Sequence, residues 1–142
     1  MQPFTGVILA GGQGHRIGRD KARLVLRGKT LIERVAARVH QVTDDLVIVT
    51  RRPEAYAGLE ARLTTDRAPS TGSLAGIQAG LLAARYPWSL VVACDMPFLN
   101  LALLRYLIGL AGDYDVVIPR VEGLLEPLHA LYHKRCLAVI ER

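Results

Sequence analysis

The chain has 142 residues, of which 51% are hydrophobic and 6% aromatic, and its formal net charge is +5. This length fits one domain with a substantial core, and the apolar fraction excludes an intrinsically disordered chain. No apolar stretch reaches the roughly 20 residues of a membrane helix, and the start, MQPFTGVILA, lacks the basic region and cleavage site of a signal peptide.

We therefore expect a cytoplasmic protein that does not associate with a membrane. The basic residues are scattered along the chain and are not interleaved with aromatic residues. This distribution argues against nucleic acid as a partner and favours a small phosphorylated ligand.

Apolar runs rich in Val and Ile predict strands, and segments of helical period lie between them. The predicted strands are Phe4–Ala10, Leu46–Thr50, Ser89–Asp95 and Asp115–Pro119. Their hydrophobic residues hardly alternate with polar ones, as in strands covered on both faces. The first helix follows Thr30, because Glu33 three residues later completes a capping box.

Two further helices are predicted from apolar stripes. One begins near Ser73 and carries Leu74, Ile77, Leu81 and Ala84, and the other carries Leu101, Leu104 and Ile108. The alternation of strands and helices predicts an α/β sandwich with a mainly parallel sheet. Right-handed crossovers would place the strand carboxyl ends along one edge, where ligands bind in open α/β sheets.

The loop after the first strand, within LAGGQGHRIGRDKA, is the first candidate site. Its spacing of Gly12, Gly14 and Gly18 fits neither the dinucleotide fingerprint nor the P-loop motif. Two interpretations remain open: glycines whose backbone N–H groups approach a polyphosphate beside Arg16 and Lys21, or an ordinary turn with solvated basic residues.

Two carboxylates are expected at the same edge of the predicted sheet. Asp95 ends an apolar strand before Pro97, so it either binds Mg²⁺ together with phosphate oxygens or caps a turn. Asp66 precedes a loop whose glycines, Gly72 and Gly76, form either a second ligand site or an N-capped helix entry.

The cysteines and histidines suggest no separate chemistry. Cys94 and Cys136 lie far apart and outside any CxxC motif, so they are interpreted as buried thiols. His129 and His133 lie four residues apart without an HExxH motif, which favours structural roles for both.

Four ordered motifs resemble the molybdenum cofactor guanylyltransferase family. LAGGQGHRIGRDKA resembles its LAGG…R-x-G-x-D-K signature, DRAPSTGSLAGIQAGL its D…GPLAGI…GL segment, CDMPFL its metal-binding motif and EPLHALY its P-L-x-A-L-Y element. The resemblance implies a Rossmann-like three-layer sandwich of the nucleotidyltransferase type. It also implies transfer of GMP from Mg-GTP to molybdopterin with release of pyrophosphate.

The same resemblance implies the roles of individual residues. The backbone of Leu9, Ala10, Gly11 and Gly12 would hold the nucleotide. Lys21 and Arg16 would contact the phosphates, Asp66 would help to fix the guanosine, and Asp95 would bind Mg²⁺. The chain departs from the pattern at Thr50, where some members of the family carry Asn.

The resemblance further implies GTP and molybdopterin as substrates, and as partners the proteins of molybdenum insertion or molybdoenzyme maturation. Residues 1–142 are expected to form a single nucleotidyltransferase domain that lacks its C-terminal part, because the family usually continues beyond the helix at LAVIER. Two alternatives stay open: a relative that uses CTP or another phosphorylated acceptor, and a non-catalytic nucleotide-binding fragment.

Overall fold

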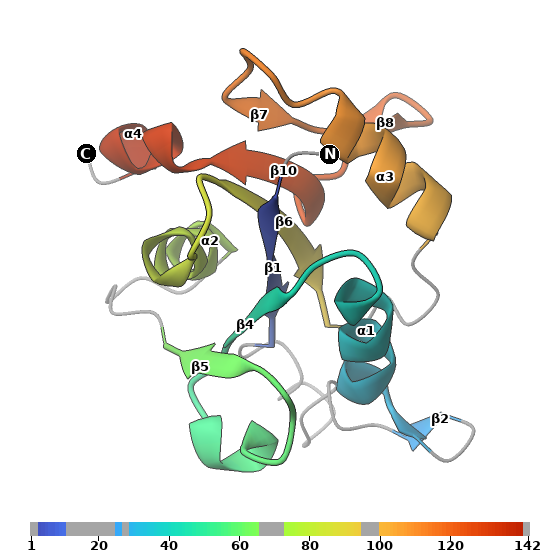
Figure 1. Ribbon diagram of the computed structural model, residues 1–142, viewed down its shortest axis with the longest axis vertical. Coiled ribbons are helices and arrows are strands. Elements are labelled where there is room, and N and C mark those ends of the chain that lie inside the picture. Colours follow the sequence, from blue (N-terminus) through green and yellow to red (C-terminus); the bar gives the residue numbers. More distant parts are fainter. Residues whose placement is uncertain (1–2, 11–24, 27–28, 66–72, 95–99, 141–142) are drawn as a thin grey trace.

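The computed structural model describes residues 3–10, 25–26, 29–65, 73–94 and 100–140. Its centre is a six-stranded sheet in the order β5-β4-β1-β6-β10-β7 (Figure 1). In that order the strands are Arg62–Thr64, Asp45–Val49, Phe4–Leu9, Trp88–Ala93, His129–His133 and Val116–Val117. The pairs β5/β4, β4/β1 and β1/β6 are parallel, and β10 is antiparallel to both of its neighbours. The prediction of a mainly parallel α/β sandwich is confirmed.

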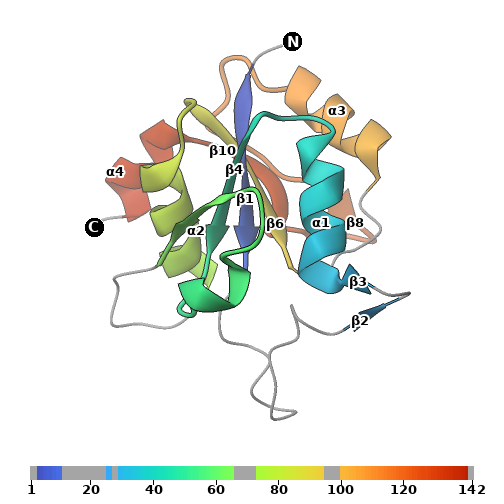
Figure 2. The same cartoon turned by 60° about the horizontal axis from the view of Figure 1, so that its bottom comes forward.

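Helices cover both faces of this sheet. The helices α1 (Leu31–His40) and α3 (Leu101–Gly109) pack on one face, and α2 (Ser73–Ala83) and the short α4 (Leu137–Ile140) pack on the other (Figure 2). The remaining elements are two hairpins and two 3-10 helices. They are β2–β3 (Val25–Leu26, Lys29–Thr30), β8–β9 (Arg120–Val121, Leu124–Leu125), η3 (Pro53–Tyr56) and η4 (Lys134–Cys136). Within the described ranges, no helix is long and apolar enough to cross a membrane.

The predicted capping box is present at the start of α1. The Thr30 hydroxyl accepts a hydrogen bond from the Glu33 N–H at 3.2 Å, and the Glu33 carboxylate accepts one from the Thr30 N–H at 3.3 Å. These reciprocal bonds satisfy two backbone donors that the first turn of a helix leaves without partners. The sequence alone therefore located this helix start.

The predicted stripe of α2 is wrong at one residue. Ile77, Leu81 and Ala84 are buried, but Leu74 is 59% exposed. The face of α2 that lies closest to the sheet carries Gly76 and Gly80, which face Leu9 and Val7 of β1. This rotates Leu74 out of the interface.

The six-stranded sheet differs from the sequence prediction at three strands. The predicted strand Asp115–Pro119 is reduced to Val116–Val117 at the sheet edge, and the strands Arg62–Thr64 and His129–His133 were not predicted. Histidines at both ends of the last of these obscure its apolar centre, although Ala130 and Leu131 are completely buried. The strand carries the chain back antiparallel between β6 and β7.

Close contact between α2 and β1 depends on Gly80. A Cβ atom at this position would lie 2.4 Å from Cγ1 of Val7, a fully buried residue of β1. Valine is stiff at χ1 and cannot swing this methyl group away, so a side chain at position 80 would force the helix off the sheet.

We expect Gly80→Ala to lower the free energy of unfolding by about 1–3 kcal/mol, because it overpacks a close contact. Gly109→Ala is the matched control: this residue also lies in a helix, but no atom within 4 Å would meet its Cβ. That variant should be neutral or stabilise the protein by up to about 1 kcal/mol. Urea denaturation of both variants measures the difference, and equal effects would contradict the packing argument.

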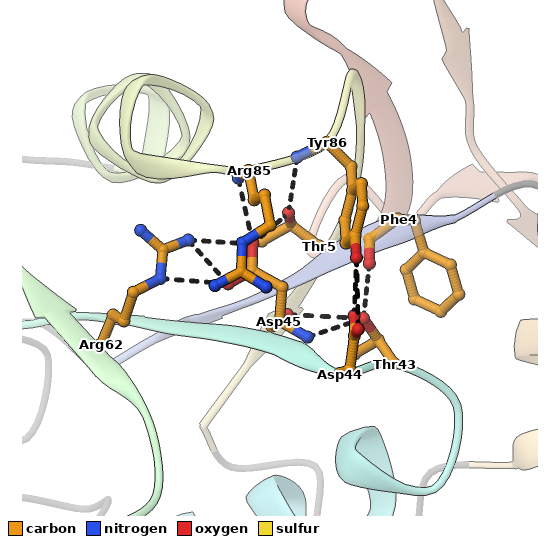
Figure 3. A network of polar contacts seen from close by, with 8 residues as sticks. All are labelled: Phe4, Thr5, Thr43, Asp44, Asp45, Arg62, Arg85 and Tyr86. Atoms are coloured by element: carbon orange, nitrogen blue, oxygen red, sulfur yellow. Dashed lines mark hydrogen bonds and ion pairs between the residues drawn. The ribbon is translucent and has the colours of Figure 1, made fainter.

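A buried carboxylate ties together the start of the sheet, at the edge opposite the strand carboxyl ends (Figure 3). Asp45 is 2% exposed and accepts hydrogen bonds from the Thr5 hydroxyl at 2.6 Å and from the Arg85 N–H at 3.0 Å. The half-exposed Arg62 guanidinium also donates to it, at 2.7 Å and 2.9 Å from Nη2. Thr5 in turn accepts from the Tyr86 N–H at 3.3 Å. Four chain segments therefore meet at one charge.

The ionised form of Asp45 stabilises the fold. Burial works against the charge, but the hydrogen bonds from Thr5, the Arg85 N–H and Arg62 outweigh it and lower the pKa below the ordinary value of 3.8. A carboxyl whose pKa is lower in the folded state contributes stability above its unfolded pKa. That contribution is lost as the pH falls through the folded pKa.

We expect Asp45→Asn to lower the free energy of unfolding at pH 7 by about 1.5–3 kcal/mol, because it removes the charge from several hydrogen bonds. The difference from the unchanged protein should shrink as the pH falls below 3.8. Denaturant unfolding over a pH series measures this. Asp44→Asn, at an exposed carboxylate bonded to the Tyr86 hydroxyl, is the control and should have a smaller effect. Identical pH profiles for the two variants would refute the assignment.

Candidate active site

The carboxyl ends of four parallel strands lie side by side. The register pairs Leu9 of β1 with Val49 of β4 on one side and with Ala93 of β6 on the other. Val49 is paired in turn with Thr64 of β5. The four segments that leave these strands therefore begin along one edge, as the sequence pattern predicts.

Backbone pairing continues one residue beyond the strands. The Ala10 N–H donates to the Val49 carbonyl at 2.9 Å, the Thr50 N–H to the Thr64 carbonyl at 2.9 Å, and the Cys94 N–H to the Leu9 carbonyl at 3.2 Å. These bonds fix the first residue of three of the segments. We call the strand ends joined by these bonds, Leu9–Ala10, Val49–Thr50, Thr64 and Ala93–Cys94, the platform.

The structure describes only part of the predicted nucleotide site. Leu9 is the last residue of β1, and Ala10 follows it. Ala10 is 4% exposed, and the Leu9 side chain packs against Gly76 of α2. The other predicted site residues lie outside the described residues. They are Gly11, Gly12, Arg16, Lys21, Asp66 and Asp95. In the sequence, Gly11 follows Ala10, Asp66 follows Thr65 and Asp95 follows Cys94.

The turn after β4 is held by Thr50. This residue is 2% exposed, and its hydroxyl accepts a hydrogen bond from the Arg52 N–H at 3.0 Å. The turn places Arg51 and Arg52 at the exposed surface beside the platform. Two basic residues thus lie at the surface directly after β4.

The interpretation of Gly76 as a loop residue of a ligand site is wrong. Gly76 lies in the first turns of α2 and is buried, and a Cβ there would meet Cδ2 of Leu9 at 3.2 Å. Its small size serves helix–sheet packing directly behind the platform. Gly72 lies outside the described residues.

The two cysteines form no disulfide with each other, and the interpretation of both as buried thiols is wrong, because each is only partly buried. Cys94 lies just past the end of β6 and packs against the core on one face of the sheet, and Cys136 ends η4 and packs against the core on the other face. In the described segments, no three His, Cys, Asp or Glu side chains gather into a metal-binding group. The predicted ligand Asp95 belongs to the undescribed part.

The two histidines of β10 differ in their surroundings. His133 has a structural role, as predicted. Its Nδ1 accepts a hydrogen bond from the Arg135 N–H at 3.0 Å, and its ring packs edge-on against Trp88 with the ring centroids 5.2 Å apart. The Nε2 atom of His129 is buried and has no hydrogen-bond partner within the described part of the chain. Burial lowers the pKa of His129, and nearby Glu126 raises it by less. A satisfied structural role was expected for both residues; for His129 the described residues supply no partner for Nε2.

Solved structures with this arrangement define the class of protein. A crystal structure of molybdopterin-guanine dinucleotide biosynthesis protein A from Archaeoglobus fulgidus is similar with a TM-score of 0.81 and 32% identity, covering 98% of this chain and 72% of that one. A 4-diphosphocytidyl-2C-methyl-D-erythritol synthase from Anaerococcus prevotii shares the fold with a TM-score of 0.72 at 16% identity, covering 99% and 74%. The protein is a nucleotidyltransferase with a Rossmann-like sandwich.

Sequence comparison then defines the family. Residues 6–142 match the model of the MobA-like NTP transferase domain, and the chain belongs to this family. A molybdenum cofactor guanylyltransferase from Desulfosudis oleivorans is 46% identical over 100% of this chain and 71% of its own length. A probable molybdenum cofactor guanylyltransferase from Natronomonas pharaonis is 42% identical over 94% of this chain and 70% of its own length.

Nucleotidyltransferases of this family generally use a divalent metal ion. A Mycobacterium tuberculosis protein that shares the fold was crystallised as a complex with manganese. It has a TM-score of 0.75 and 19% identity, and the match covers 99% of this chain and 76% of that one.

Proposed function

We propose that this protein transfers GMP from Mg-GTP to molybdopterin and releases pyrophosphate. The observation that carries the proposal is the 46% identity to a molybdenum cofactor guanylyltransferase over the full length of the chain. The platform of strand ends supports it, because it brings together the starts of the segments that contain the proposed ligand residues.

The backbone hydrogen bonds at the end of β1 limit which N–H groups can bind a phosphate. The Ala10 N–H and the Leu9 carbonyl are already used in pairing with β4 and β6. Backbone donors for a phosphate must therefore come from residues beyond Ala10, which favours the N–H groups of Gly11 and Gly12. In this proposal Leu9 and Ala10 position these glycines, and Lys21 and Arg16 add positive charge.

Asp66 and Asp95 complete the proposed site. Asp66 follows β5 at the outer end of the platform and is assigned to the guanosine, while Asp95 follows β6 and is assigned to the metal ion. The donor set suits Mg²⁺, which retains several waters and needs only one or two carboxylates beside phosphate oxygens. When bound, the metal would neutralise charge on the phosphates.

The proposed chemistry needs positioning more than a protein nucleophile. A terminal phosphate oxygen of the acceptor forms a bond to the α-phosphorus of GTP, and the bond from that phosphorus to the bridging oxygen breaks. The pyrophosphate leaves with the electron pair. The chain's task is to orient two polyanions in line and to offset their repulsion with Lys21, Arg16 and the proposed phosphate-binding N–H groups.

Residues 1–142 are proposed to act as a single nucleotidyltransferase domain in the cytoplasm. Proteins that insert molybdenum or mature molybdoenzymes are the proposed partners, because the product is a cofactor that must be handed on.

Base choice is tested by incubating the protein with each labelled nucleoside triphosphate, Mg²⁺ and molybdopterin and measuring pyrophosphate release. We expect turnover with GTP that stops when a chelator removes the metal. Preference for CTP would overturn the guanine assignment. Binding of GTP without release of pyrophosphate would reduce the protein to a nucleotide-binding partner.

We expect Asp95→Ala to lower kcat by about a hundredfold or more, because charge in the transition state loses its metal-based stabilisation. Asp113→Ala removes an exposed carboxylate near the opposite edge of the sheet and should leave kcat unchanged. Circular dichroism should show both variants folded. Full activity of the Asp95 variant would show that the metal assignment is wrong.

Lys21→Ala should raise the KM for GTP about tenfold or more, because a charge-assisted hydrogen bond to phosphate is lost. Lys134→Ala, at the end of β10 far from the platform, is the matched control. Initial rates at varied GTP concentration measure both variants. An unchanged KM in the Lys21 variant would remove this residue from the phosphate site.

A further inference from the structure

The outward side of α2 carries a line of mostly apolar side chains. Leu74 and Leu82 are each 59% exposed, and Gln78 between them is half-buried. Residues four apart lie on one side of a helix, one above the other, so these three form a line about 12 Å long. The line lies on the side of α2 opposite Gly76 and Gly80, which face β1. We call these three residues the α2 stripe.

A further exposed apolar side chain lies on the neighbouring helix α4. The two helices lie beside each other on the same face of the sheet (Figure 1). Leu137 and Ile140 of α4 pack against the core on that face, whereas Val139 is 67% exposed. The exposed apolar surface on this side of the molecule is therefore not limited to α2. Exposed apolar side chains that gather on one surface indicate an interaction site more strongly than single ones do.

The helix α2 carries no charge, although the chain is rich in charged residues elsewhere. None of the 11 residues Ser73–Ala83 is Asp, Glu, Lys or Arg. A helix at a protein surface is normally polar on its solvent side, and one that is apolar all round is normally buried. Other exposed apolar side chains have charged neighbours, because Tyr106 follows Arg105 and the leucines of β9 precede Glu126. The composition of α2 is thus that of a helix covered on both sides.

The order of residues along the α2 stripe fits a second copy of the same chain. Leu74 and Leu82 lie at equal distances in the sequence on either side of Gln78. Two α2 helices that pack antiparallel about a two-fold axis at Gln78 therefore bring Leu74 of each copy against Leu82 of the other. At the axis, the amide of each Gln78 can donate an N–H to the side-chain oxygen of the other. The stripe is thus complementary to itself.

Electrostatics also favours the antiparallel arrangement. A helix carries partial positive charge at its N-terminus, here Ser73, and partial negative charge at its C-terminus, here Ala83. An antiparallel pair places each N-terminus near the C-terminus of the other copy. Each copy has a net charge of +5, but none of it lies on α2, so no like charges meet at the centre of the contact. A polar Gln78 at the axis would fix the register, as a single buried polar residue does in coiled coils.

We propose that the α2 stripe is a dimer interface, at which two copies of this chain pack α2 against α2 about a two-fold axis at Gln78. The inference is independent of the proposed transfer reaction, because it concerns a face of the sheet and not the ends of its strands. Standard interfaces bury about 800 Å² per partner, and three residues supply only the centre of such an area. The dimer is therefore weak and dissociates on dilution.

Sedimentation velocity of the full chain over a series of protein concentrations measures this dimer. We expect the dimer fraction to rise with concentration, and Leu82→Glu to weaken association about tenfold or more, because it places a carboxylate against Leu74 of the other copy. Leu124→Glu is the matched control: it makes the same change at a leucine of β9 that is 70% exposed, and should leave association unchanged. Circular dichroism and thermal unfolding establish that both variants fold.

A cysteine at the axis tests the two-fold arrangement itself. Gln78→Cys brings two thiols together across the axis, whereas Gly109→Cys places a thiol at an exposed position of α3, on the other face of the sheet. Diamide oxidises two thiols to a disulfide and is itself reduced to the hydrazine. Non-reducing electrophoresis should then show a covalent dimer of Gln78→Cys, well above the level given by Gly109→Cys and by the unchanged protein with its own Cys94 and Cys136.

The inference is overturned if the unchanged protein stays monomeric at the highest concentration, or if Leu82→Glu and Leu124→Glu dimerise equally well. A dimer that Gln78→Cys does not trap as a disulfide also overturns it, because the axis would then lie elsewhere. These results leave the proposed transfer reaction untouched, since pyrophosphate release is measured separately.

Discussion

The structure depends on parallel pairing along both sides of β1. This strand bonds to β4 and β6, and the pairing extends past its end through the Ala10 N–H and the Leu9 carbonyl. Buried strands of this kind leave no freedom in register, because a slip of one residue would exchange the side chains of the two cores. At the other end of β1, the hydrogen bond from the Thr5 hydroxyl to Asp45 holds the start of the strand. The candidate site therefore lies at the end of a strand, β1, that is held at both its start and its end.

The layered fold was predictable because its signals are local. Continuous Val- and Ile-rich runs distinguish buried parallel strands, and Thr30 with Glu33 marks a helix start by chemistry confined to one turn. The antiparallel return through β10 was not predictable in this way. Its five residues have histidines at both ends, and its partners in the sheet lie far away in the sequence. Similarly, the exposure of Leu74 follows from which side of α2 carries glycines against Leu9 and Val7.

The candidate site also combines features that local sequence signals predict with features that they do not. The place of Leu9 and Ala10 at the sheet edge followed from strand polarity alone, whereas the roles of Lys21, Asp66 and Asp95 came from motif resemblance and remain proposals. The unpartnered Nε2 atom of His129 is a tertiary feature. Within the described residues it depends on which elements pack around the imidazole, and the sequence around it, PLHAL, carries no metal or catalytic spacing.

The same fold occurs in solved structures of low sequence identity. A 4-diphosphocytidyl-2C-methyl-D-erythritol synthase from Anaerococcus prevotii shares it at 16% identity, and a fold by itself does not determine which substrate a protein binds. Backbone pairing at Ala10, Thr50 and Cys94 does not depend on side-chain identity, so it can hold the strand ends in place whatever side chains follow. In the proposed function, base and acceptor are therefore distinguished by side chains attached to these strand ends and not by the pairing itself.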